Sequence, residues 1–189
     1  MSVVANVLCS FASWVAYDGR SSRNGEIISE STDKAEMINS SVCVGYTGSL
    51  ELAELVVLNL KEHVTGISDM KSDMVAQAIK LLLPNLKAPD GVFSDFLVTG
   101  INSSGLMASY TLGSNHEFFM HIPRGDELKV SVLHSMKNTL DLTPYVSKHI
   151  QRTGFCELSI KSAFCEYIGD VAKIDPSVNK YCRILTLRK

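Results

Sequence analysis

Residues 2–20, SVVANVLCSFASWVAYDGR, contain two runs of β-forming residues, Val3–Leu8 and Ser13–Tyr17, separated by a short polar break. This arrangement predicts a β-hairpin. Ser2, at the start of the first run, becomes the chain terminus once the initiator methionine is removed. A terminal serine carries a hydroxyl nucleophile and an α-amino base in one residue, and an amine with a pKa of roughly 7.7–8.0 is suited to proton transfer near neutral pH. The stretch therefore predicts both a β-hairpin and a candidate nucleophile.

The rest of the chain alternates between groups of strands and pairs of helices. Period-2 runs predict strands at Glu26–Ser29, Ala35–Ile38, Val42–Tyr46, Asp95–Gly100, Leu106–Thr111, Glu117–His121, Leu128–Leu133 and Tyr181–Leu187. Apolar residues at helical spacing predict helices over Ser49–His63, Ser72–Leu83, Thr143–Arg152 and Glu157–Lys173. This order favours an α+β fold over a doubly wound sheet. Two stacked sheets with a helix pair on each outer face would bury all these apolar faces, so we expect a four-layer αββα sandwich that forms a single domain over residues 2–189.

Composition limits the classes of partner. The 189 residues are 46% hydrophobic and 20% charged, with a net charge of −2, which argues against nucleic acid or an anionic membrane as the main partner. We identify no targeting segment and no apolar run long enough to span a bilayer. The five cysteines include no CxxC pair, so we expect buried, reduced thiols in a cytoplasmic protein.

Four segments resemble the proteasome β-subunit/HslV group of N-terminal nucleophile (Ntn) hydrolases. They are SVVANV (2–7), VAYDGR (15–20), DKAEMI (33–38) and VGYTGS (44–49). The match runs without gaps from Ser2 to about Leu60, and the later element order also agrees. The resemblance implies the four-layer αββα fold, a peptidase that hydrolyses peptide or unfolded protein substrates, and a homo-oligomeric ring that encloses the active sites. An AAA+ ATPase is a possible partner of such a ring.

The resemblance also implies roles for individual residues. Ser2 would be the nucleophile and its free amine the general base. Lys34 would lower the pKa of that amine, and Asp18 would orient and pair with Lys34, with Arg20 bracing the same loop. Gly48 would offer its backbone N–H to the developing oxyanion. The reaction would proceed through an acyl-enzyme ester at Ser2.

The sequence departs from the pattern of this group in four places, one of which is Val3, the second residue of the mature chain, where threonine is common. Most members begin with threonine, whereas this chain would begin with serine, which supplies the same hydroxyl. The supporting Gly-Ser-Gly loop is best matched by Ser135, with both glycines lost. In the late Asp-x-x-Ser-Gly motif Asp175 stands for the aspartate, Ser177 comes one place early, and Val178 occupies the serine position.

Four further residues fall where the resemblance places the pocket for the residue before the scissile bond: Thr32, Glu36, Tyr46 and Glu54. Two carboxylates would favour a basic side chain, and Tyr46 would narrow the floor of the pocket. A preference for substrates with a basic residue at this position is therefore the expected specificity.

Two alternatives remain open at the level of sequence. The first is a catalytically silent ring subunit or scaffold, which the degraded loops support and which a retained Met1 would enforce by blocking the amine. The second is a small-molecule Ntn amidase that needs no closed ring. No H-x-x-x-H or H-E-x-x-H spacing occurs among the five histidines, so we expect neither a metal nor a cofactor.

Overall fold

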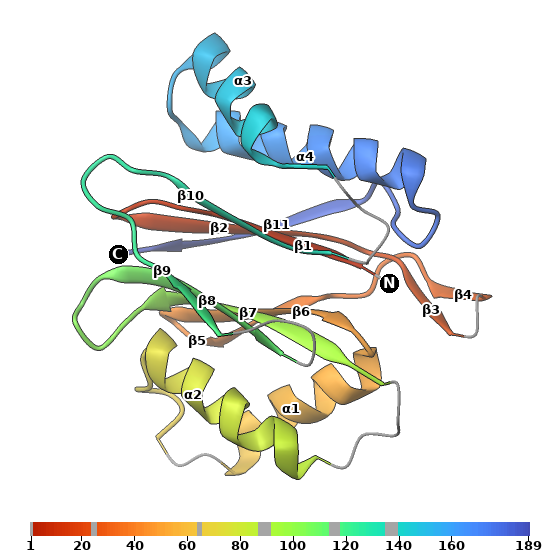
Figure 1. Ribbon diagram of the computed structural model, residues 1–189, viewed down its shortest axis with the longest axis vertical. Coiled ribbons are helices and arrows are strands. Elements are labelled where there is room, and N and C mark those ends of the chain that lie inside the picture. Colours follow the sequence, from red (N-terminus) through yellow and green to blue (C-terminus); the bar gives the residue numbers. More distant parts are fainter. Residues whose placement is uncertain (1, 24–25, 64–65, 87–91, 114–117, 135–139) are drawn as a thin grey trace.

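The computed structural model describes residues 2–23, 26–63, 66–86, 92–113, 118–134 and 140–189. Its elements form two β-sheets that face each other, and helices cover the outer face of each sheet (Figure 1). The layers are therefore helix, sheet, sheet and helix. The α+β class predicted from the order of the elements is confirmed.

The first sheet includes the strand that directly follows the candidate nucleophile, Ser2. Its strands lie in the order β10 (Lys129–His134), β1 (Val3–Leu8), β2 (Ala12–Asp18) and β11 (Cys182–Arg188), all antiparallel. The predicted hairpin is β1 and β2, and both strands are buried along their whole length. A strand covered on both faces requires continuous apolar or small residues, which explains the nearly unbroken apolar run from Val3 to Leu8.

The second sheet is antiparallel throughout and has five strands. Their order is β5 (Ala35–Asn39), β6 (Val42–Gly48), β7 (Ser94–Ile101), β8 (Met107–Gly113) and β9 (Phe119–His121). A separate small hairpin, β3 (Ser21–Arg23) with β4 (Glu26–Ser29), follows β2 and projects from the same end of the molecule as Ser2 (Figure 1).

Two helix pairs enclose the sheets. Helices α1 (Leu50–His63) and α2 (Ser72–Leu82) cover the five-stranded sheet, and α3 (Thr143–Thr153) and α4 (Glu157–Ile174) cover the four-stranded sheet (Figure 1). Helix α2 gives way to a 3-10 turn at Leu83–Asn85, because Pro84 lacks the N–H that would continue the helix.

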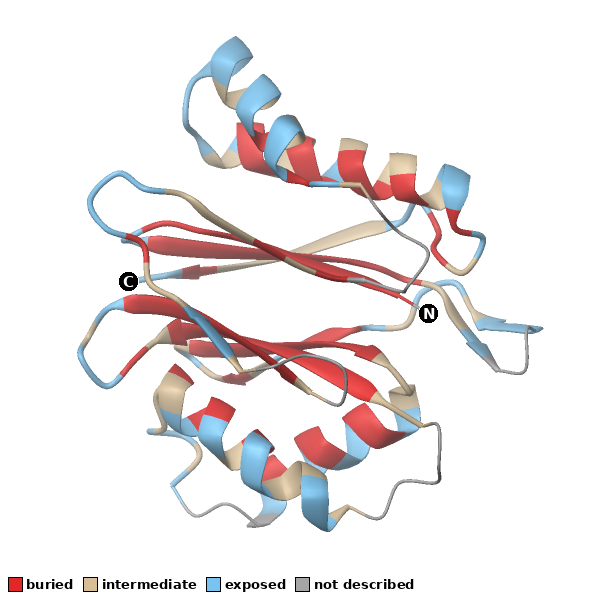
Figure 2. Cartoon of the chain, viewed as in Figure 1, coloured by how far each residue is buried: buried red, intermediate tan, exposed pale blue. Residues whose placement is uncertain are grey.

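The core consists of three apolar layers, seen as the red inner faces in Figure 2. One layer packs α3 and α4 on the four-stranded sheet, around residues such as Trp14, Phe164 and Tyr167. A second packs α1 and α2 on the five-stranded sheet, around Phe96 and Leu60. The third lies between the two sheets and includes Val4, Val15, Leu97 and Leu133.

The contact between the two sheets fixes the position of β1, and with it Ser2. A Cβ atom on Gly45 of β6 would lie 2.6 Å from Val4 Cγ1, so only glycine lets β6 approach β1 this closely. A buried polar group joins the sheets as well: Asn6 Nδ2 donates to Ser13 Oγ (2.7 Å), and Ser13 Oγ lies 2.8 Å from Thr99 Oγ1 on β7. Such hydrogen bonds in an apolar layer favour one register over its alternatives.

Candidate active site

Asp18, the last residue of β2, is the centre of the site. Its carboxylate is completely buried and accepts three hydrogen bonds. Oδ1 accepts from the Val3 N–H (2.9 Å) and from Lys34 Nζ (2.7 Å), while Oδ2 accepts from the Arg20 N–H (3.0 Å). A buried carboxylate needs this many partners, because an unpaired charge away from water is strongly unfavourable. The carboxylate therefore ties the residue after Ser2 to the side chain of Lys34.

Lys34 enters the site from the segment before β5. Its side chain is 3% exposed, and its carbonyl accepts the Tyr46 N–H (2.9 Å), which anchors the segment to β6. Burial lowers the pKa of the Lys34 ammonium below its usual range, although the Asp18 carboxylate opposes this effect. Lys34 and Asp18 thus form a buried ion pair directly beside the start of β1.

Asp33, the residue before Lys34, accepts hydrogen bonds on both its side chain and its backbone carbonyl. Asp33 Oδ1 accepts the Tyr17 hydroxyl (2.9 Å) and a bond from Arg183, and the Asp33 carbonyl accepts the Tyr46 hydroxyl (3.1 Å). The Arg183 guanidinium holds the pKa of the Asp33 carboxyl below its usual range, so this acceptor stays ionised. Burial, reinforced by Asp33, raises the pKa of Tyr17 to about 12, so its hydroxyl remains a donor at neutral pH.

Gly48 ends β6 immediately before α1. Its φ of +92° is in the region that favours glycine, and a Cβ atom there would lie 2.4 Å from the Phe93 carbonyl oxygen. Ser49 follows it, donates its N–H to Phe93 O (2.8 Å), and accepts the Leu52 N–H on its side-chain oxygen (3.3 Å) at the first turn of α1. Only glycine fits this junction of strand and helix.

Three of the predicted catalytic residues line one cavity of about 400 Å³: Ser2, Lys34 and Gly48. Ser2 is only 8% exposed. The other walls come from Ser21, Ser22 and Ile28 of the β3–β4 hairpin and from the Tyr46–Glu51 segment. A cavity of this size accommodates a side chain or a small ligand. The arrangement places a hydroxyl, a buried ammonium and a strand-to-helix junction around one small space.

Arg20 and Asp175 lie beside this centre. The Arg20 guanidinium pairs with Glu30 (2.9 Å) and donates to the Pro176 carbonyl (2.5 Å). Asp175 is buried at the end of α4, where Oδ1 accepts the Ser177 N–H (2.9 Å) and hydroxyl (2.5 Å). Asp175 therefore stabilises the loop that contains Pro176, whose carbonyl accepts the hydrogen bond from Arg20. Val178, at the expected serine position, is buried in the layer under α4.

Three of the four predicted pocket residues line a second cavity of about 540 Å³, namely Glu36, Tyr46 and Glu54. Tyr46 and Glu51 line both cavities, so the two are adjacent. Glu36 is paired with Lys61, which belongs to the same wall. Thr32 is not among the described residues that line either cavity; its hydroxyl donates to Ser21 Oγ (2.8 Å) and its N–H to the Gly19 carbonyl (2.8 Å).

Ser135 lies outside the described residues.

Within the described ranges, no cluster of three or more His, Cys, Asp or Glu side chains is arranged to hold a metal ion. The described helices include none with the length and apolar character needed to cross a membrane.

Comparison with known proteins identifies the fold. A structure of eukaryotic HslV from Trypanosoma brucei superposes with a TM-score of 0.64 over 99% of both chains. The chain has an HslV-like fold. The two sequences are 13% identical, so this likeness concerns the fold alone. A scan against protein-family models finds no match, and a search of curated proteins finds no related sequence.

The HslV-like fold also brings in residues that the sequence did not single out. Asn179, from the loop between α4 and β11, accepts the Gly19 N–H (3.0 Å) and so contacts the turn that follows Asp18. The hairpin residues Ser21 and Ser22 and the β6 residue Thr47 line the cavity of Ser2. Ser21, Ser22 and Thr47 are close in sequence to the predicted Arg20 and Gly48, which was a usable signal. Asn179 is 160 residues from Gly19, and no local pattern connects the two.

Proposed function

We propose that this chain is an Ntn hydrolase that cleaves peptide or amide bonds through Ser2 after removal of Met1. The observation that carries the proposal is the Asp18 carboxylate, whose Oδ1 binds both the Val3 N–H and Lys34 Nζ. This shared oxygen keeps the Lys34 ammonium next to the residue that follows the nucleophile. The gap-free register of Ser2, Asp18, Lys34 and Gly48 supports the same conclusion.

The proposed reaction follows from these groups. The free amine of Ser2 accepts the proton of its own hydroxyl as Oγ attacks the substrate carbonyl carbon. The neighbouring Lys34 ammonium lowers the pKa of this amine and so keeps it in its basic form at neutral pH. The Gly48 N–H stabilises the oxyanion. The amine then protonates the leaving nitrogen, an ester forms at Ser2, and water activated by the same amine releases the acid.

The assembly is part of the same proposal. We propose a single αββα Ntn-hydrolase domain that forms a homo-oligomeric ring, takes peptide or unfolded protein substrates, and can work with an AAA+ ATPase. The HslV-like fold supports a ring, since the named neighbour is an HslV. Native mass determination tests this part, because a ring requires many copies of the 20.7 kDa chain, whereas an amidase that needs no ring predicts a monomer or dimer.

Ser2→Ala tests the chemistry. The variant removes the nucleophile and leaves the amine, so hydrolysis of a fluorogenic peptide should fall by at least about a thousandfold. Ser22→Ala is a matched control, because Ser22 lines the same cavity but has no proposed chemical role. A Ser2→Ala protein as active as the parent would reject the proposal.

A silent ring subunit is the second candidate. It is favoured by Val178, an apolar buried residue where active members of the resembled group have a serine. This candidate predicts a ring of normal mass with no peptidase activity in the parent protein.

A further inference from the structure

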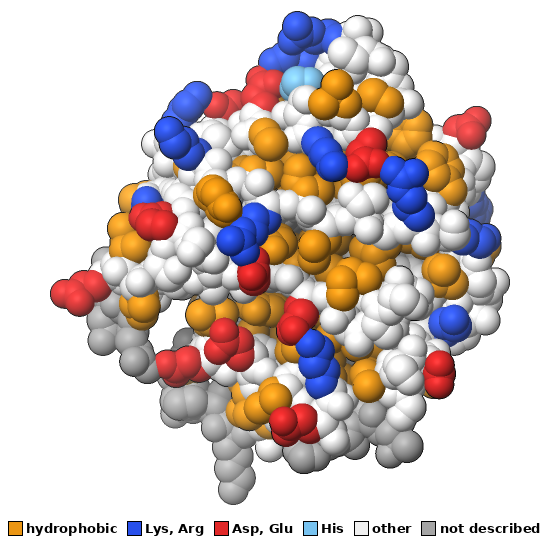
Figure 3. All heavy atoms as spheres, turned by 180° about the vertical axis from the view of Figure 1, so that it is seen from behind, with side chains coloured by type: hydrophobic (Ala, Val, Ile, Leu, Met, Phe, Trp, Pro, Cys, Tyr) orange, Lys and Arg blue, Asp and Glu red, His pale blue; other side chains and the backbone are white. Residues whose placement is uncertain are grey.

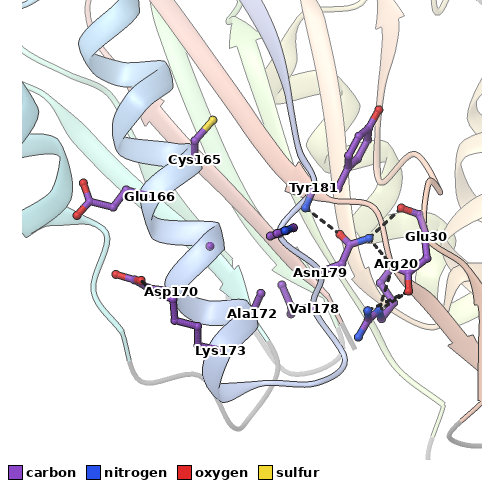
Figure 4. Close-up of a pocket in the computed structure, with 12 residues that line it drawn as sticks. Arg20, Glu30, Cys165, Glu166, Asp170, Ala172, Lys173, Val178, Asn179 and Tyr181 are labelled. Carbon is purple, nitrogen blue, oxygen red and sulfur yellow. Dashed lines mark hydrogen bonds and ion pairs between the residues drawn. The ribbon is translucent and has the colours of Figure 1, made fainter.

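We propose that Asn179 is a positioning residue for the proposed reaction, which acts by holding the Gly19–Arg20 turn against the Asp18 carboxylate. This inference rests on the proposed function, and it concerns a residue that the resemblance does not assign. Asn179 is 9% exposed and lies in the loop between α4 and β11, next to a groove of about 940 Å³ (Figure 4).

The Asn179 amide joins three separate segments of the chain. Its Oδ1 accepts the backbone N–H of Gly19 (3.0 Å) and of Tyr181 (3.3 Å). Its Nδ2 donates to the Glu30 carbonyl (2.8 Å) and to Glu30 Oε2 (2.6 Å). Figure 4 shows the Asn179 side chain between Tyr181 on one side and Glu30 and Arg20 on the other. These four hydrogen bonds fix the orientation of the Asn179 amide. If the amide were reversed, its NH2 group would face the two backbone N–H groups and its oxygen would face the two Glu30 oxygens.

The turn that Asn179 contacts is closely packed around Gly19. A Cβ atom on Gly19 would lie 2.5 Å from the Glu30 carbonyl oxygen and 3.1 Å from Tyr181 Cδ1. The Gly19 carbonyl in turn accepts the Thr32 N–H (2.8 Å). Gly19 is thus enclosed by the same two segments that Asn179 bridges.

The peptide unit between Gly19 and Arg20 connects Asn179 to the Asp18 carboxylate. Gly19 is followed by Arg20, whose N–H donates to Asp18 Oδ2 (3.0 Å), while the other oxygen of Asp18 holds Val3 and Lys34. If the turn loosens, Asp18 loses one of its three donors and the Lys34 ammonium loses a well-placed partner. Errors of about 1 Å at such supports can lower rates by about a hundredfold.

Asn179→Asp is the test variant, because it keeps the shape of the side chain but removes both donors and places a carboxylate against Glu30, and the repulsion between the two carboxylates moves Oδ1 away from the Gly19 N–H. Asn102→Asp is the matched control. Asn102 is also buried, and its Oδ1 also accepts two backbone N–H groups, from Ser104 and Leu106. It follows β7, whose far end is about 23 Å from the Ser94 end that adjoins Gly48.

Two readouts separate this inference from the proposed function. The first is amide hydrogen exchange, which should become faster at Gly19 and Arg20 in Asn179→Asp and stay unchanged there in Asn102→Asp. The second is kinetics: kcat should fall about ten- to a hundredfold with KM nearly unchanged. The acid limb of kcat/KM should also move to higher pH, because a weakened Asp18–Lys34 pair leaves less positive charge to lower the pKa of the Ser2 amine.

The double variant Asn179→Asp/Glu30→Gln provides a rescue, since Gln supplies an amide donor opposite the new carboxylate. Partial recovery of kcat supports a positioning role and not a general loss of folding. In an active parent, unchanged exchange, kcat and pH profile in Asn179→Asp would overturn the inference and leave the proposed function intact. In a parent without activity or Ser2 reactivity the proposed function fails; the exchange of Gly19 and Arg20 then decides by itself whether Asn179 holds the turn.

Discussion

Two ion pairs lie near Tyr46, and they differ in almost every property that determines what an ion pair contributes. Asp18 and Lys34 have side chains that are 0% and 3% exposed, and the carboxylate has two further backbone donors. Glu36 and Lys61 have side chains that are 47% and 37% exposed, and they line the open second cavity. The first pair is fixed by its surroundings, whereas the second is screened by water.

The difference indicates a division of tasks. A buried pair whose carboxylate accepts three hydrogen bonds holds charge at a defined position, which suits groups that tune the pKa of a nucleophile's base. An exposed pair can rearrange when a ligand arrives, which suits a wall that selects substrates. On the surface seen in Figure 3, acidic and basic side chains are interspersed.

The largest expected effect comes from breaking the buried pair. Lys34→Met should lower the free energy of unfolding by about 3–5 kcal/mol, because Asp18 is then a buried charge without its cation. Lys61→Met makes the same chemical change in the exposed pair and should cost less than about 1 kcal/mol. Urea denaturation with matched m values measures both. Equal effects from the two substitutions would contradict the contrast between the pairs.

Peptide hydrolysis should separate the same two variants. In the proposed mechanism the Lys34 charge lowers the pKa of the Ser2 amine, so Lys34→Met should raise that pKa and reduce activity at neutral pH. Lys61→Met should retain most of its kcat.

A smaller effect is expected at the junction beside the buried pair. Gly48→Ala places a methyl group 2.4 Å from the Phe93 carbonyl oxygen at a φ of +92°, so stability should fall by about 1–3 kcal/mol and kcat should fall with it. Gly105→Ala is the control, since Gly105 has a φ of +73° and open space around its Cα. It should cost only about 1 kcal/mol and leave kcat unchanged. Thermal unfolding and peptide kinetics on both variants distinguish the close contact from backbone strain alone.

The smallest effect concerns the second cavity. Glu54→Gln removes one carboxylate from its wall and should reduce kcat/KM for peptides with a basic residue before the scissile bond by about fivefold, or about 1 kcal/mol. Glu62→Gln, in the last turn of α1 and not among the described lining residues of either cavity, is the control. A parent that prefers acidic residues at this position would reject the predicted specificity.

Much of the fold could be predicted because its signals are local. Val3–Leu8 and Glu26–Ser29 have the predicted bounds, and the four helices agree to within a residue at each end. The strand β3 (Ser21–Arg23) was not predicted, because its residues are polar and do not have the composition typical of a strand.

The candidate site, like the fold, has a part that the local sequence predicts and a part that it does not. The register of Ser2, Lys34 and Gly48 comes from the first 48 residues, where the spacing along consecutive strands brings the three to one cavity. The supporting contacts could not be predicted, because they join distant segments: Arg20 reaches the Pro176 carbonyl, and Gly19 reaches Asn179. A polar residue in a loop shows no periodicity, so its burial and partners become visible only in the folded chain.

The most direct measurement for the whole account is the intact mass of the purified protein before and after treatment with a peptide electrophile aimed at N-terminal nucleophiles. The account predicts loss of Met1, one adduct per chain, and no adduct in Ser2→Ala. A retained Met1 without an adduct, or an adduct that persists in Ser2→Ala, would contradict it.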